Sequence, residues 1–170
     1  MKLRFFFSTI FMLLAVAIAA LGFAGEPQHN GKAPSLVGTY KLIMRQLPDG
    51  TKQTAPEVMG LLTYTKTHRN FNVVWKDANG KFFSYAVVST YKLSATEYSE
   101  TVIFSALNDQ ISGQPIKYDL TGASQTVPVK ITGSRIEFKM PFDPVTIVFD
   151  ENWVTGKAEG RFTDYWERVE

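Results

Sequence analysis

The feature that most constrains the fold is a period-two alternation of apolar and polar residues, which recurs from Leu36 to the C-terminus. A β-strand directs successive side chains to opposite faces, so alternation marks a strand with one buried face and one solvated face. No segment shows convincing helical periodicity, and the chain is therefore predicted to be all-β. The clearest apolar sets are Tyr40/Leu42/Met44, Leu62/Tyr64, Phe71/Val73/Trp75, Ile116/Tyr118/Leu120, Ile136/Phe138/Met140 and Val145/Ile147/Phe149.

Turn-forming residues separate these segments. Asn79-Gly80 suits a tight hairpin, and Asp49-Gly50 and Asp143-Pro144 mark further turns. Short strands at this spacing predict a sandwich or barrel of roughly eight to ten strands. Because the first strand begins near Leu36 and the last ends near Glu170, an antiparallel up-and-down barrel could pair the two and leave no open edge. We predict that barrel.

The N-terminus has the layout of a secretory signal peptide. Lys2 and Arg4 precede an apolar run, and small residues at 22 and 24 suit cleavage after Ala24. Cleavage after Ala20 and an uncleaved membrane anchor are the alternatives. We therefore expect a signal peptide at 1–24, a flexible leader at 25–35 and a barrel domain at 36–170. The expected location is periplasmic or secreted, with no stable membrane span after cleavage.

Composition narrows the classes of function. Loss of Lys2 and Arg4 leaves 16 of the 18 basic residues, which balance the 16 acidic ones. A neutral mature chain without a Lys/Arg run does not favour nucleic-acid binding. The chain has no Cys and two His, so neither a disulfide framework nor a zinc site is expected. We predict no metal and no cofactor, and leave the oligomeric state open.

Six short motifs occur in a characteristic order along the chain: Leu36–Leu42, Asp49-Gly50, Gly60–Tyr64, Tyr91–Leu93, Glu97–Thr101 and Tyr165–Val169. Together they resemble bacterial lipocalin-like domains, small exported barrels of the calycin type. The resemblance spans about Leu36 to Glu170 and implies a lipocalin-like fold with a tendency to bind small apolar ligands. It also implies barrel-closure roles for Gly38, Tyr40, Trp166 and Arg168, with Arg168 packing over the first-strand ring, where Tyr40 replaces the family's Trp.

Glu100 is the most informative single residue, because alternation places it on one face with Tyr98, Val102 and Phe104. An unpaired buried carboxylate costs several kcal/mol, so a partner is expected. The candidates are Arg168, Arg161, His68 or a Tyr hydroxyl. Glu100 would then be a ligand-orienting or acid/base carboxylate, a structural ion-pair partner at the barrel floor, or a residue whose face is misassigned by one.

His68-Arg69 is expected between two strands at the barrel rim, either as an exposed turn or as a polar gate that contacts an anion. The aromatic residues could line a pocket or fill the barrel, since a barrel of about eight strands allows either. The candidate ligand-binding residues are Tyr64, Phe71, Trp75, Tyr85, Glu100, Tyr118, Phe138 and Arg168.

Three functions follow from these observations. The first is binding of a small hydrophobic or amphipathic ligand in the barrel interior. The second is a filled barrel of the cell envelope that binds a protein partner. The third is a small enzyme of the isomerase or lyase type, for which Glu100 is the single weak catalytic candidate. No nucleophile elbow, phosphate-binding Gly loop or zinc-protease motif is present, so the sequence favours binding over catalysis.

Overall fold

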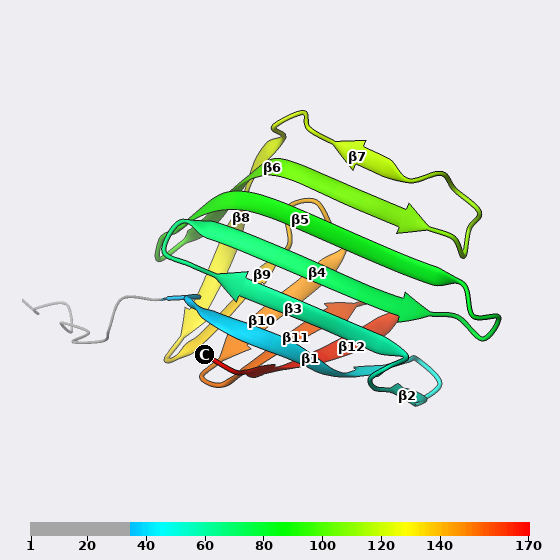
Figure 1. The fold of residues 1–170 in the computed structure, drawn as a ribbon. Coiled ribbons are helices and arrows are strands. Elements are labelled where there is room, and N and C mark those ends of the chain that lie inside the picture. The colour runs from blue at the N-terminus through cyan, green and yellow to red at the C-terminus, as the bar shows by residue number, and fades with distance from the viewer. Residues whose placement is uncertain (1–34) are drawn as a thin grey trace, which may run out of the picture. The chain divides into compact units, whose positions relative to one another are not determined.

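A computed structural model describes residues 35–170, whose strands form one antiparallel sheet that closes on itself (Figure 1). Ten strands make the ring, and each pairs with the next ring strand along the chain. The short strands β2 and β7 are additions beside β1 and β6. The predicted all-β up-and-down barrel is confirmed. The strands are β1 (Gly38–Gln46), β2 (Lys52–Gln53), β3 (Val58–Tyr64), β4 (His68–Lys76), β5 (Phe82–Leu93), β6 (Glu97–Asp109), β7 (Lys117–Asp119), β8 (Ser124–Thr132), β9 (Arg135–Lys139), β10 (Val145–Asp150), β11 (Trp153–Ala158) and β12 (Phe162–Arg168).

The predicted signal peptide at residues 1–24 lies outside the described residues. The leader expected at residues 25–35 also lies outside them, except for Ser35. Within residues 35–170, no helix is long and apolar enough to cross a membrane.

The first and last strands of the ring close the barrel. β1 pairs with β3 on one side and with β12 on the other, with Tyr40 opposite Arg168 and Leu42 opposite Trp166. The pairing continues to the end of the chain, where the Thr39 amide donates to the Glu170 carbonyl at 3.0 Å. Closure removes the unpaired backbone groups that an open sheet would expose at these two strands.

Two β-bulges reverse the faces predicted by strict alternation. In β1 the register shifts between Leu42 and Met44, so Arg45 points inward and is buried while Met44 turns outward. In β6 the extra residue is Ile103, and Phe104 lies on the outer face at 38% exposure. Met44 was expected on the same face of its strand as Leu42, and Phe104 on the same face as Glu100. Both expectations were wrong, because each bulge inserts one residue and so reverses the faces of the residues that follow it.

The predicted buried set Ile116, Tyr118 and Leu120 was also wrong. These side chains are 55%, 71% and 77% exposed. The short strand β7 pairs only with β6, and β8 pairs with β6 only along Glu97–Thr101. β7 therefore extends the sheet beyond the ring, and its side chains do not face the barrel interior (Figure 1).

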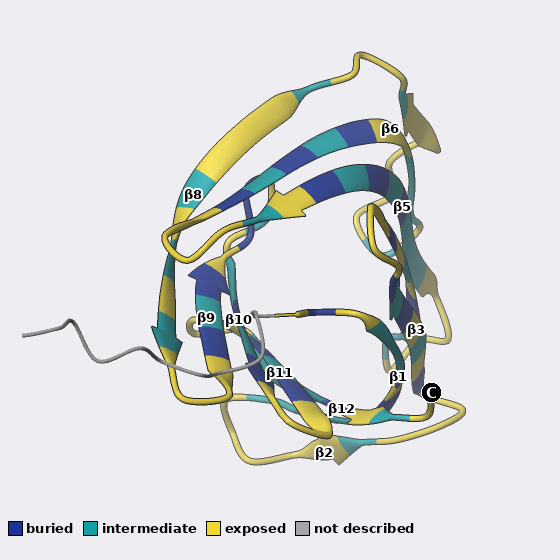
Figure 2. Cartoon of the chain, turned by 90° about the vertical axis from the view of Figure 1, so that its left-hand side faces the viewer, coloured by how far each residue is buried: buried dark blue, intermediate teal, exposed yellow. Residues whose placement is uncertain are grey.

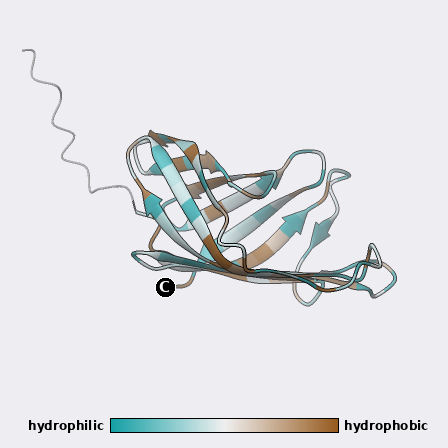
Figure 3. Cartoon of the chain, turned by 90° about the horizontal axis from the view of Figure 1, so that it is seen from above, coloured by the Kyte–Doolittle hydropathy of each residue, from teal (hydrophilic) through white to brown (hydrophobic). Residues whose placement is uncertain are grey.

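The core occupies the barrel interior, where buried residues alternate with exposed ones along the strands (Figure 2). Hydropathy alternates along the same strands when the barrel is seen from above (Figure 3). At the end where β1 begins and β3 ends, aromatic rings pack edge-on or stacked, with centroids 5.0 Å apart for Tyr64–Tyr91 and 4.3 Å for Tyr98–Phe138. We call this set the aromatic cluster; it comprises Tyr40, Tyr64, Tyr91, Tyr98, Phe138 and Phe149.

Gly60 allows Trp166 to approach the β3 backbone. A Cβ at this position would lie 2.7 Å from the Trp166 ring and 2.9 Å from the Asn72 carbonyl oxygen. We expect Gly60→Ala to lower the free energy of unfolding by about 1–3 kcal/mol, measured by urea denaturation, because the Asn72 backbone cannot move aside cheaply. The control is Gly156→Ala, where the new methyl meets only Val145 at 3.4 Å. Equal stability of the two variants would contradict this prediction.

Candidate functional site

Beside the aromatic cluster, the barrel interior holds a cavity of about 160 Å³, which we call the inner cavity. Its wall is mainly aromatic and aliphatic, with a few charged side chains at defined positions. The aromatic and aliphatic residues are Leu62, Phe71, Val73, Trp75, Phe83, Tyr85, Met140, Pro144, Val145, Ile147, Phe162 and Trp166. The charged residues are Arg45, Arg69, Asp143, Arg161 and Asp164, and Gly156 completes the lining.

Glu100 is 1% exposed and accepts three hydrogen bonds. The donors are Arg69 Nη1 at 3.0 Å, the Ser89 hydroxyl at 2.6 Å and the Tyr98 hydroxyl at 2.9 Å. A Tyr hydroxyl was among the partners expected from the sequence. The cationic partner is Arg69, which was not among the expected basic partners Arg168, Arg161 and His68. Glu100 does not line the inner cavity; it holds Arg69, which does.

Arg69 belongs to a strand. β4 already begins at His68, so the expectation that His68-Arg69 lies between two strands was wrong. Alternation then exposes His68 and buries Arg69 to 4% exposure. The Arg69 Nε is buried and has no hydrogen-bond partner among the described residues. A buried unsatisfied donor costs about 1–3 kcal/mol, and this nitrogen is closed to solvent.

A second ion pair lies on the cavity wall. Arg45 Nε and Nη2 donate to the two carboxylate oxygens of Asp164 at 2.7 and 2.8 Å. The Arg45 guanidinium also lies 4.3 Å from the Trp75 ring centroid and 4.0 Å from that of Phe162. Burial raises the pKa of Asp164, and the Arg45 charge opposes that rise. The bidentate contact and the two rings fix Arg45 in place.

Neither member of this pair was predicted from the sequence to be a site residue. Asp164 shares the inner face of β12 with Trp166, and this alternation was the available signal. Arg45 reaches the interior only because of the β1 bulge, for which the sequence offers no comparable signal.

Asp143 is a third polar group that sequence reasoning did not assign to the site. It sits in the connection between β9 and β10 and lines the inner cavity. None of the four salt bridges found among residues 35–170 involves Asp143. Burial raises the pKa of this carboxyl; the Arg69 and Arg161 charges lower it, and Glu100 raises it further.

The structure separates the other residues predicted to bind ligand. Phe71, Trp75 and Tyr85 line the inner cavity. Tyr64 and Phe138 belong to the aromatic cluster. Tyr118 lies outside the barrel.

Arg168 is absent from the cavity wall and lies against the barrel-closure residues. Its guanidinium is 5.4 Å from the Tyr40 ring centroid and donates to the Val37 carbonyl. A side chain at Gly38 would overlap the Arg168 guanidinium. Trp166 is buried and packs 5.8 Å from Phe71, centroid to centroid. This arrangement matches the contact between first and last strands that the lipocalin-like resemblance implies.

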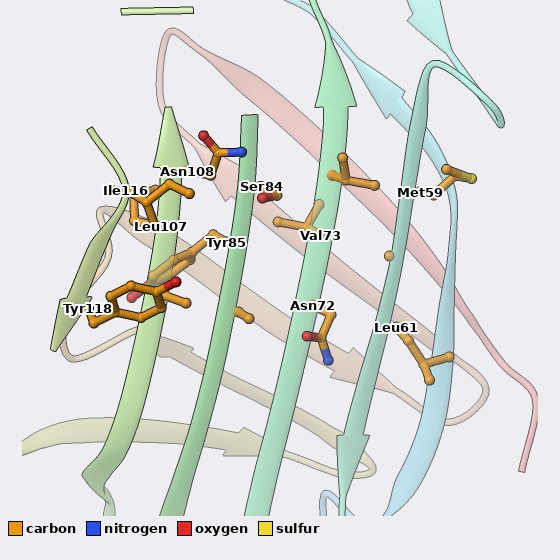
Figure 4. A pocket seen from close by; sticks show the side chains of 14 residues that line it. Met59, Leu61, Asn72, Val73, Ser84, Tyr85, Leu107, Asn108, Ile116 and Tyr118 are labelled. Atoms are coloured by element: carbon orange, nitrogen blue, oxygen red, sulfur yellow. The ribbon is translucent and has the colours of Figure 1, made fainter. Parts of the chain in front are cut away.

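A second hollow, of about 640 Å³, lies over the outer face of β3 to β6 and is bordered by β7 (Figure 4). We call it the outer groove. Met59, Leu61, Ile116 and Tyr118 are its exposed apolar residues, at 44%, 45%, 55% and 71% exposure. The polar residues Asn72, Ser84 and Asn108 lie among them.

No protein-family model, curated protein or solved structure matches the chain. The lipocalin-like resemblance therefore stands on the quoted motifs and on the closed antiparallel barrel.

The Arg69–Glu100 pair yields a stability prediction. Glu100→Gln leaves the buried Arg69 charge uncompensated, so we expect the free energy of unfolding to fall by about 3–5 kcal/mol. Replacing both partners, as Arg69→Met with Glu100→Leu, should recover most of that loss. The control is Glu137→Gln, which breaks the exposed Arg135–Glu137 pair and should cost about 0–1 kcal/mol. Urea denaturation measures all three, and equal effects of the two single substitutions would contradict the assignment.

Proposed function

We propose that this protein is an exported binding protein that holds a small amphipathic molecule in the inner cavity. The observation that carries the proposal is the cavity itself, which remains open next to a tightly packed aromatic cluster. Export to the periplasm or the exterior follows from the predicted signal peptide at residues 1–24, with residues 36–170 as the binding domain. The lipocalin-like resemblance supports the same class of function.

The chemistry of the wall supports a small ligand with an apolar part. Binding sites are typically apolar with a few placed polar groups, as here. The volume of about 160 Å³ lies below the ~300–1,000 Å³ typical of drug-sized ligand sites, which favours a compact molecule. Arg161 and Pro144 line the cavity and are exposed, so solvent reaches it near these residues.

The geometry gives the enzyme alternative less support. Glu100 was its basis, and this carboxylate is held by three donors and lies away from the cavity wall. A general base must reach the proton that it removes. The arrangement therefore favours a structural role for Glu100.

A cavity-filling substitution tests the proposed function. Val145 lines the inner cavity, whereas Val148 lies on the opposite face of the same strand, β10. We expect Val145→Phe to weaken binding of hexyl probes, hexan-1-ol or hexane-1-sulfonate, by about tenfold or more, and Val148→Phe to leave it unchanged. Isothermal titration calorimetry measures the affinities. If neither probe binds the wild-type protein, or if both variants bind equally, the proposal fails.

A second candidate function, recognition of a protein partner, is favoured by the outer groove. Exposed apolar patches of this kind mark interaction surfaces. Here the exposed apolar side chains lie along two sides of the groove, on β3 and on or beside β7, and β7 ends the sheet with an unpaired edge that a partner strand could join.

The groove can be tested separately from the cavity. We expect Leu61→Ser with Tyr118→Ser to reduce, by several-fold, retention of a partner from a detergent extract of the native envelope on the immobilised protein. The control is Trp153→Ser, because Trp153 is 48% exposed on β11, away from the groove. Quantitative mass spectrometry identifies and measures the partner. Equal retention by the double variant and the control would reject the groove as the binding surface.

A further inference from the structure

Arg69 presents an incompletely satisfied cation to the inner cavity. Its side chain is 4% exposed, and Nη1 donates to Glu100. The buried Nε donates to no acceptor in residues 35–170. A guanidinium carries five N–H donors and no acceptor, so only an acceptor atom can satisfy the remainder. The Nε is closed to solvent, so a ligand oxygen in the cavity would meet the Nη end of the guanidinium, because Arg69 lines the cavity.

Arg161 adds a second cation to the same cavity. It lies in the turn between β11 and β12, is exposed, and takes part in none of the four salt bridges among the described residues. Arg45, by contrast, gives two donors to Asp164. Arg69 has one donor engaged by a carboxylate, and Arg161 has none engaged in a salt bridge among residues 35–170, so both keep more donors for a ligand than Arg45, whose guanidinium is also held against two rings. Guanidinium groups bind oxyanions with charge-assisted hydrogen bonds.

Asp143 is the negative group that opposes an incoming anion. The charged and titratable groups that interact electrostatically with it are Arg69 on β4, Glu100 on β6, the Tyr85 hydroxyl on β5 and Arg161. The Arg45–Asp164 pair also lines the cavity. With Asp143 ionised, the three arginines are balanced by Glu100, Asp143 and Asp164. With Asp143 protonated, the site carries one net positive charge.

We propose that the ligand is a small organic anion with an apolar tail, whose anionic group binds Arg69 and Arg161 in competition with the Asp143 carboxylate. The proposal rests on the proposed function, since it names the ligand class of the same cavity. It also makes binding acid-sensitive, because protonation of Asp143 removes the competing charge.

The direction in which anion affinity changes with pH follows from the protonation of Asp143. Burial raises the pKa of Asp143 from its ordinary value, so this group takes up its proton at a higher pH than an exposed Asp does. Affinity for an anion that stays ionised therefore increases with falling pH. By reciprocity, the bound anion raises the pKa of Asp143 further, and binding takes up a proton from the buffer.

The experiment compares three hexyl probes: hexane-1-sulfonate, which stays ionised throughout, neutral hexan-1-ol and cationic hexylammonium. Isothermal titration calorimetry is run between about pH 5 and pH 8 in buffers of different ionisation enthalpy. We expect sulfonate to bind most tightly, to gain roughly tenfold in affinity at the acidic end, and to take up protons on binding. Hexan-1-ol should show neither pH dependence nor proton uptake.

Asp143→Asn is the decisive variant, and Asp150→Asn, an exposed residue at the far end of β10, is its control. We expect Asp143→Asn to bind sulfonate tightly at every pH without proton uptake, and Asp150→Asn to match the wild type. Arg161→Gln, which changes an exposed side chain, should weaken sulfonate binding several-fold and leave hexan-1-ol unaffected.

The outcomes separate the two proposals. Binding of hexan-1-ol in preference to sulfonate, or sulfonate binding that Asp143→Asn does not change, overturns this inference and leaves the proposed function standing. Failure of all three probes to bind, or binding that Val145→Phe does not weaken, overturns the proposed function as well.

Discussion

The buried ion pair between Arg69 and Glu100 is the interaction on which the barrel interior depends. It joins strands whose paired residues lie 31 positions apart in the chain. Through Tyr98 it is bonded to the aromatic cluster, where burial raises the pKa of Tyr64 to about 12. Through Arg69 it reaches the inner cavity. In a medium of low dielectric constant neither charge is tolerated alone, so the pair fixes β4 against β6 at the junction between packed core and open cavity.

The fold was readable from the sequence because it depends on a simple rule. Alternation in segments such as Phe71–Trp75 and Ile136–Met140 reports which face is buried, and closure of the first strand on the last follows from where they lie in the chain. Alternation does not predict where a β-bulge occurs. At Ile43 and Ile103 one extra residue reverses the face, and the residues that follow, among them Arg45 and Phe104, were therefore assigned to the wrong side.

The site was readable only in part, because it is assembled by pairings distant in sequence. Alternation within single strands was enough to single out Glu100 as a candidate buried carboxylate, and Phe71, Trp75 and Tyr85 as candidate pocket residues. Arg69, the partner of Glu100, was expected between two strands at the barrel rim, although β4 begins at His68. Asp143 sits in a connection whose direction is set by the strands on either side, β9 and β10. Nothing in its local sequence shows that the carboxyl faces a cavity.

The polar content of the interior argues against a barrel that is simply filled. Apolar side chains of similar volume would stabilise the fold at least as well as two buried ion pairs, and they would leave no unsatisfied donor on Arg69. Proteins depart from an apolar interior with fully satisfied polar groups mainly where function requires it. Here the departures lie close together: Arg69, the Arg45–Asp164 pair and the Asp143 carboxyl line the same inner cavity, and Glu100 holds Arg69 from behind the wall, whereas the aromatic cluster beside the cavity is closely packed. Their convergence on one volume is what an interior binding site requires and what packing alone does not produce.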